Sequence, residues 1–109
     1  MQLPLDITFR GMSSSPAVER AVNRWADRMV HAFDRIQDCH VWIEVPHHHR
    51  QRGAQFSVKV ALSVPGREIV ASVEGPDIYI AVAEAFLAAR RQLQDYARIR
   101  RGDVKAHAA

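Results

Sequence analysis

Hydrophobic and polar side chains alternate at every second position in four stretches of the chain. These stretches are residues 3–9, 39–45, 56–62 and 67–73. A period of two is typical of a strand that buries one face. Pro65-Gly66, between the last two stretches, predicts a tight turn. Pro4 cannot donate a main-chain hydrogen bond, so we expect the first strand to be bonded on only one side there.

Two further stretches have the period of an amphipathic helix. In the first, apolar residues recur at steps of four, three, four and four from Val18 to Phe33, and the Ser-Pro pair at 15–16 is a typical helix start. The second covers residues 77–101, with Asp77 as its N-cap and a glycine after it as a stop signal. Its first half is apolar and its second half is rich in arginine.

The predicted order of elements is therefore β-α-β-β-β-α. Four strands with one apolar face each and two helices with one apolar stripe each are best buried as an α+β two-layer sandwich, a four-stranded sheet with two helices packed on one face. The other face of the sheet stays open. At 109 residues the chain can bury one core. We expect one domain over residues 1–102 and a flexible tail over residues 103–109.

The composition is that of a soluble globular protein, with 48% hydrophobic and 25% charged residues. The single cysteine, Cys39, excludes an internal disulfide and fits a reducing compartment. The N-terminus lacks the features of a signal peptide, and no apolar run approaches the ~20 residues that span a bilayer. We expect a cytoplasmic protein without membrane contact.

The charge is distributed unevenly along the chain. The formal net charge is +3, but residues 90–109 alone carry six basic and two acidic side chains, which leaves −1 for the remainder. Such an asymmetry indicates a polyanionic partner, and arginine suits RNA because its planar fork binds phosphate in a bidentate manner. The predicted RNA-binding residues of this segment are Arg90, Arg91, Arg98, Arg100, Arg101 and Lys105.

A histidine-rich loop joins the second and third predicted strands. Its candidate RNA-binding residues are His47, His48, His49, Arg50 and Arg52. Consecutive loop histidines point in different directions, and no carboxylate or thiol accompanies them, so we expect no metal. Two interpretations stay open, a basic loop that faces RNA and a solvated hairpin tip. Trp42, on the open sheet face, either stacks on a base or covers its neighbours in the sheet.

No set of side chains has the spacing of a catalytic or cofactor site. The serines at 13–15 lack a Gly-x-Ser-x-Gly context, the strand glutamates are scattered, and there is no Gly-rich phosphate loop. Cys39 falls on the inward side of its strand, where a core residue is expected rather than a nucleophile. We expect a protein that is not an enzyme, with no cofactor and no small-molecule substrate.

Three stretches of the sequence are similar to those of a known family. They are Leu5-Asp6-Ile7-Thr8-Phe9-Arg10 with Ser15-Pro16-Ala17, then Cys39-His40-Val41-Trp42-Ile43-Glu44, then Asp77-x-Tyr79-x-Ala81-Val82 followed by Arg91-Gln92-Leu93. In these stretches the chain resembles the ribosome hibernation family, the RaiA and hibernation-promoting-factor proteins once called sigma-54 modulation proteins. The resemblance covers nearly the whole chain, and the last stretch is its most specific part. The fold that it implies is β-α-β-β-β-α, which agrees with the order obtained from the periodicity.

The resemblance implies a stationary-phase or stress factor that binds rRNA of the small ribosomal subunit in the mRNA and tRNA channel and inhibits translation. By position, it adds Asp77, Tyr79 and Arg91 to the RNA-binding residues. Many relatives have lysine where this chain has Ala88, and Arg90 is the expected replacement. The loop and the last residues are similar to those of members continued by a cold-shock-like domain, so we expect a short form of such a protein.

Two other functions are kept beside the ribosome-binding hypothesis. A generic module for structured RNA would use the same arginines. A protein-interaction subunit would instead use the apolar residues 78–80 and Leu87. Weak homodimerisation is also left open.

Overall fold

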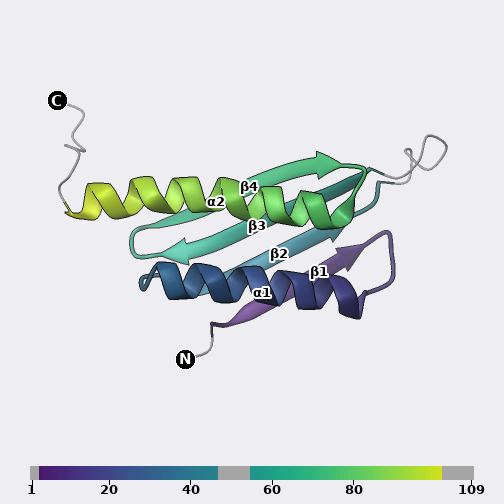
Figure 1. Ribbon diagram of the computed structural model, residues 1–109, viewed down its shortest axis with the longest axis horizontal. Coiled ribbons are helices and arrows are strands. Elements are labelled where there is room, and N and C mark those ends of the chain that lie inside the picture. Colours follow the sequence, from purple (N-terminus) through teal and green to yellow (C-terminus); the bar gives the residue numbers. More distant parts are fainter. Residues whose placement is uncertain (1–2, 47–54, 102–109) are drawn as a thin grey trace.

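The computed structural model describes residues 3–46 and 55–101, and its elements follow the predicted order (Figure 1). They are β1 (Leu5–Arg10), α1 (Pro16–Ala32), β2 (Asp38–Glu44), β3 (Phe56–Val64), β4 (Arg67–Gly75) and α2 (Ile78–Arg101). The four strands form one sheet, and both helices cover the same face of it. The predicted α+β two-layer sandwich is thus confirmed.

The strands lie in the order β1-β2-β3-β4, with β1 parallel to β2 and the other pairs antiparallel. A parallel pair needs a crossover connection, and α1 provides it. β1 is an edge strand, as Pro4 predicted, and the carbonyl of Pro4 accepts from the amide of Cys39 at 3.0 Å. The strand begins at Leu5, which pairs with Cys39 of β2, rather than at residue 3.

Gly11 makes the turn that leads out of β1 possible. Its φ is 75°, a conformation that side chains rarely adopt, and a Cβ there would collide with the carbonyl oxygen of Val45. The amide of Val45 donates to the carbonyl of Arg10 at 3.0 Å. The ends of β1 and β2 are therefore held together beside the first turn of α1.

Both helices begin where the sequence predicted. The hydroxyl oxygen of Ser15 accepts from the amide of Val18 at 3.3 Å, and proline follows at the first helical position. In α2, the Asp77 carboxylate accepts from the amides of Tyr79 at 2.9 Å and Ile80 at 3.1 Å. Each cap satisfies main-chain donors that the first turn leaves free.

The core lies between the sheet and the two helices. Val82, Phe86 and Leu93 of α2 are at most 1% exposed, and the Phe86 ring stacks on Trp25 of α1 with centroids 6.0 Å apart. The buried inward side chains of the sheet that complete the core are Cys39, Val41, Ile43, Val58, Val60, Leu62, Val64, Ile69 and Ala71. Within the described residues, neither helix has an apolar stretch long enough to cross a lipid bilayer.

Phe86 provides a test of this packing. We expect Phe86→Ala to lower the free energy of unfolding by roughly 3–5 kcal/mol, because it leaves a cavity beneath Trp25 and removes a fully buried ring. The neighbouring Leu87→Ala is the matched control; Leu87 is 39% exposed, so its loss should be about 1 kcal/mol or less. Urea denaturation followed by circular dichroism measures both, and equal losses would contradict the assignment of the buried side.

Candidate nucleic-acid interface

Charged side chains divide between the two sides of the sandwich. We call the outward side of the strands the sheet face. It carries two basic and five acidic residues, which are Arg10 and Lys59 against Asp6, Asp38, Glu44, Glu68 and Glu74. The sheet face therefore repels a polyanion.

The helix side of the sandwich carries more basic than acidic side chains. Among the described side chains it carries nine arginines and six acidic residues. The outward row on the two helices, which we call the helix face, consists of Arg20, Arg24, Arg28, Arg90, Arg91 and Arg98. All six side chains are exposed.

The arginines of α1 were not among the sequence candidates. Arg20, Arg24 and Arg28 are spaced by four and share one stripe, whereas Glu19 and Asp27 turn toward β1 and line a hollow beside it. Their spacing by four was the sequence signal that could have identified these arginines as one stripe. Along the sequence these arginines alternate with the acidic residues Glu19 and Asp27.

The two helices bring their arginines to a common groove. Arg28 of α1 and Arg90 of α2 line the same hollow of about 250 Å³, with Trp25 and Leu87 also in its wall. The Arg28 guanidinium lies 4.8 Å from the centroid of the Trp25 ring. The helix face is therefore continuous from one helix to the other.

Only one arginine of the helix face is paired. Arg98 bonds the Asp95 carboxylate at 2.8 Å, and these side chains are 53% and 63% exposed, so the pair contributes little to stability. In residues 3–46 and 55–100, no other basic side chain has a carboxylate within 4.0 Å. The remaining guanidinium groups of the helix face are therefore available to an external anion.

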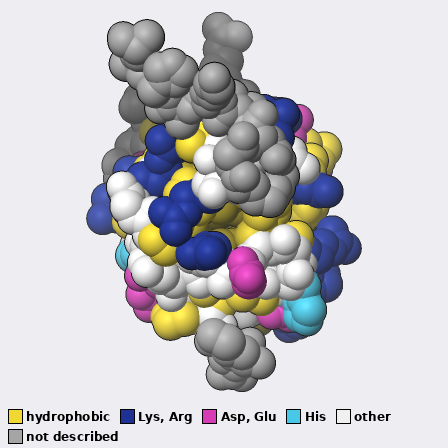
Figure 2. All heavy atoms as spheres, turned by 90° about the vertical axis from the view of Figure 1, so that its left-hand side faces the viewer, with side chains coloured by type: hydrophobic (Ala, Val, Ile, Leu, Met, Phe, Trp, Pro, Cys, Tyr) yellow, Lys and Arg dark blue, Asp and Glu magenta, His cyan; other side chains and the backbone are white. Residues whose placement is uncertain are grey.

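Arg100 lies apart from the other candidates in α2. Its guanidinium is 5.8 Å from the centroid of the Tyr96 ring, on the side that turns toward the loop after α1. Figure 2 looks onto this end of the molecule, where Lys and Arg side chains gather in the middle around hydrophobic ones. The Arg101 side chain and Lys105 lie outside the described side chains.

The last of the three stretches that resemble the family contains residues that stabilise the fold and residues whose side chains are exposed. Asp77 caps α2, and Leu93 is 1% exposed in the core. The side-chain amide nitrogen of Gln92 donates to the main-chain carbonyl of Val70 at 2.8 Å. By contrast, Arg91 is exposed and Tyr79 is 48% exposed. Tyr79 and Arg91 thus remain the candidates for contact with a partner, while the role of Asp77 in RNA binding stays a prediction.

The histidine-rich loop, with its candidates His47 to Arg52, lies outside the described residues. The strands that it joins fix where it is attached. β3 begins at Phe56, which pairs with Gly75 just before α2, so the attachment is at the end of the sheet where α2 begins. Arg98 is about 30 Å further along α2. The contribution of the loop to RNA binding stays a prediction.

Trp42 is covered by its own neighbours on the sheet face. His40 stacks on its ring with centroids 3.8 Å apart and an interplanar angle of 5°, and the ammonium of Lys59 is 4.9 Å from its centroid. The imidazole Nε2 of His40 is 2.9 Å from the hydroxyl oxygen of Thr8. Of the two interpretations of Trp42, the structure favours packing within the sheet over stacking on a base.

Cys39 is a core residue, as its register predicted. It is 2% exposed, and burial raises the pKa of its thiol to about 12, with a smaller contribution from the nearby Asp38 charge. The thiolate, which is the nucleophilic form, is therefore rare at neutral pH. Metal ligands are not clustered either, since the described residues contain no group of three or more His, Cys, Asp or Glu side chains that could hold an ion.

Residues 5–101 match the family described as Sigma 54 modulation protein / S30EA ribosomal protein. The chain belongs to this family. The resemblance noted from the three sequence stretches is thus confirmed. The description names a modulation protein and a ribosomal protein rather than an enzyme. A search of curated proteins by sequence finds no significant match.

Two solved structures are similar to this chain. A ribosomal subunit interface protein from Coxiella burnetii is 21% identical, with a TM-score of 0.72, and the match covers 87% of this chain and 98% of that one. The N-terminal domain of Protein Y from Thermus thermophilus is 15% identical, with a TM-score of 0.65, and the match covers 88% and 99%. At these identities the likeness establishes the fold.

The burial of Cys39 gives a test by thiol labelling. Because the folded pKa is about 12, above the ordinary value of 9.0, a disulfide reagent at pH 8 should react slowly with the native protein and rapidly in urea. The native state keeps the Cys39 thiol protonated to a higher pH than the unfolded state does. The free energy of unfolding should therefore fall as the pH rises above about 9. There is one cysteine, so the signal is unambiguous. Equal labelling rates in both states would refute the burial.

Proposed function

We propose that this protein binds the small ribosomal subunit through its helix face, occludes the mRNA and tRNA channel, and so inhibits translation under stress. The action is steric and takes place in the cytoplasm, without catalysis. The observation that carries the proposal is the row of exposed arginines across α1 and α2, of which only Arg98 meets a carboxylate among the described residues.

Electrostatics favour one orientation of the protein on RNA. Each guanidinium can bind a phosphate in a bidentate manner, and binding releases the counterions condensed on the nucleic acid. The sheet face carries more acidic than basic side chains and is repelled by the same phosphates. The two faces together turn the helices toward the RNA.

The ribosomal partner is supported by the family. Its description includes S30EA ribosomal protein, and the Coxiella burnetii protein of the same fold is called a ribosomal subunit interface protein. The small subunit and its channel are the finer part of the proposal, and they rest on the resemblance. The arginines alone would suit other structured RNA as well, which makes the generic RNA-binding module the alternative.

Cosedimentation separates these functions. In a stationary-phase lysate resolved on a sucrose gradient, we expect the protein to travel with small subunits, because its contacts fit one structured RNA surface. A generic RNA-binding module would spread over all fractions that contain RNA. A protein-interaction subunit that uses Tyr79, Ile80 and Leu87, which are 48%, 57% and 39% exposed, would keep its partner in high salt and carry no nucleic acid.

The salt dependence of binding tests the helix face. In Arg24→Gln with Arg91→Gln, one contact is removed from each helix, so the slope of log K against log salt for isolated small subunits should flatten by about 1.5 to 2 units. Thermal stability should stay nearly unchanged because both side chains are exposed.

The matched control removes two charges from the sheet face. In Arg10→Gln with Lys59→Gln, the net charge falls by the same amount, but the slope should keep its wild-type value. An equal loss of slope in both double variants would mean that net charge alone attracts the protein, and it would overturn the assignment of the helix face.

A further inference from the structure

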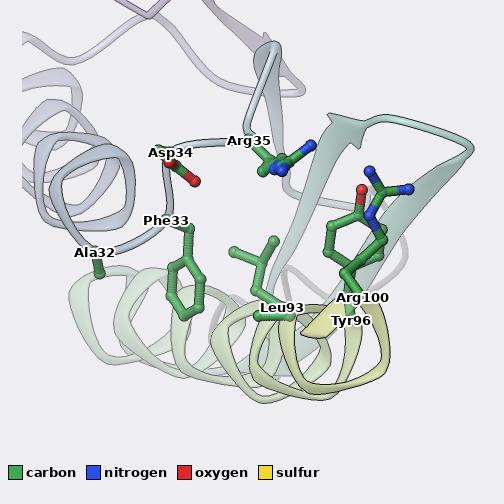
Figure 3. A pocket seen from close by; sticks show the side chains of 8 residues that line it. Ala32, Phe33, Asp34, Arg35, Leu93, Tyr96 and Arg100 are labelled. Atoms are coloured by element: carbon green, nitrogen blue, oxygen red, sulfur yellow. The ribbon is translucent and has the colours of Figure 1, made fainter. Parts of the chain in front are cut away.

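A second candidate site lies at the end of the molecule where α1 and α2 end. It is a hollow of about 300 Å³, which we call the terminal pocket (Figure 3). Its walls come from the loop after α1 and from the last turns of α2. The side chains used below are Phe33, Asp34, Arg35, Leu93, Tyr96 and Arg100.

The floor and sides of the terminal pocket are apolar and firmly held. Leu93 is 1% exposed and Tyr96 is 7% exposed, and the Tyr96 hydroxyl donates to the carbonyl of Pro65 at 2.9 Å. Phe33 is half-buried and packs against the core. Figure 3 shows Phe33 on one side, Tyr96 on the other and Leu93 between them. Of these three side chains Phe33 is the most exposed, so its ring is the apolar surface that the terminal pocket offers to a ligand.

The rim of the terminal pocket carries positive charge that no carboxylate of the described residues neutralises. Arg35 and Arg100 are exposed, and neither has a carboxylate within 4.0 Å in the described part of the chain. The Arg100 guanidinium lies 5.8 Å from the Tyr96 ring centroid, so it stands beside the apolar floor. Asp34 is the one acidic side chain of the lining. The rim thus offers two cations and one acceptor.

We propose that the terminal pocket binds one unstacked nucleotide. The base would stack on the Phe33 ring above the buried Leu93, its phosphate would meet Arg35 and Arg100, and Asp34 would accept from an N–H group on the edge of the base. An apolar ligand would leave the guanidinium groups unused, and inorganic phosphate would leave the floor unused. Single-stranded nucleotides are bound by this combination of ring stacking and arginine contacts.

This inference rests on the proposed function and adds to it. Arg98 belongs to the helix face and lies in the same turn of α2 as Arg100, but the two side chains point to opposite sides of the helix, so RNA on the helix face would reach the terminal pocket by passing around the end of α2. The helix face reads only the phosphate backbone, which carries no sequence information. A base held in the terminal pocket would give the protein a preference for one position on the RNA.

The experiment is an NMR titration of the full-length, ¹⁵N-labelled protein with GMP, guanosine and inorganic phosphate. We expect GMP to shift the amide signals of Asp34, Arg35 and Ala97 in a saturable manner, with at least ten-fold higher affinity than either guanosine or phosphate. A single-stranded RNA tetranucleotide is then added to compete with GMP. If the tetranucleotide binds more tightly than GMP, the site is assigned to RNA; if the two affinities are equal, the site is assigned to free nucleotides.

Two double variants make the titration decisive. Arg35→Gln with Arg100→Gln should weaken GMP binding at least ten-fold, whereas Arg10→Gln with Lys59→Gln, which removes the same charge from the sheet face, should leave it unchanged. The inference is overturned if both variants lose equally, or if phosphate alone reproduces the shifts with the affinity of GMP. All four side chains are exposed, so both proteins are expected to fold.

Failure of this inference is distinguishable from failure of the proposed function. If GMP does not bind but the wild-type protein still cosediments with small subunits, only the terminal pocket has been assigned wrongly. If GMP binds and the protein does not cosediment, the pocket stands and the ribosomal partner is wrong.

Discussion

The burial of one side of α2 is the constraint on which the rest of the molecule depends. Three contacts in different directions fix the rotation of this helix. The Phe86 ring stacks on Trp25 of α1, and the Gln92 side-chain amide donates a hydrogen bond to the carbonyl of Val70 in β4. The Tyr96 hydroxyl donates to the carbonyl of Pro65 in the turn between β3 and β4. Rotation about the helix axis would break all three. The outward direction of the arginines is therefore a consequence of packing, and it needs no charged partner within the protein.

The same packing separates charges that the sequence mixes. Residues 3–46 and 55–100 carry eleven basic and eleven acidic side chains, so this part of the protein is formally neutral. Folding places an excess of three positive charges on the helix side and three negative charges on the sheet face. The field of a nearby polyanion acts on this difference. A total charge or a pI cannot reveal it, because both sum over the two faces.

Much of the fold could be predicted because its signals are local. Alternation, helical periodicity, the Ser15 cap and the Asp77 cap all depend on near neighbours in sequence. The candidate site was predicted in part. Arg28 and Arg90 line one groove because of the way α1 packs beside α2. The neighbours that cover Trp42 are set by the register of the strands. Such tertiary relations have no local sequence signal.

The position of Arg91 shows how fold and candidate function are connected. Its two successors are held firmly, Gln92 by the edge of β4 and Leu93 in the core, so the backbone that carries Arg91 is fixed before any ligand arrives. A side chain that projects from a rigid backbone loses less conformational freedom on binding than one on a mobile loop. In the proposed function, the structural residues of the resemblance stretch would therefore contribute to binding without touching a partner, because they determine where the Arg91 guanidinium is placed.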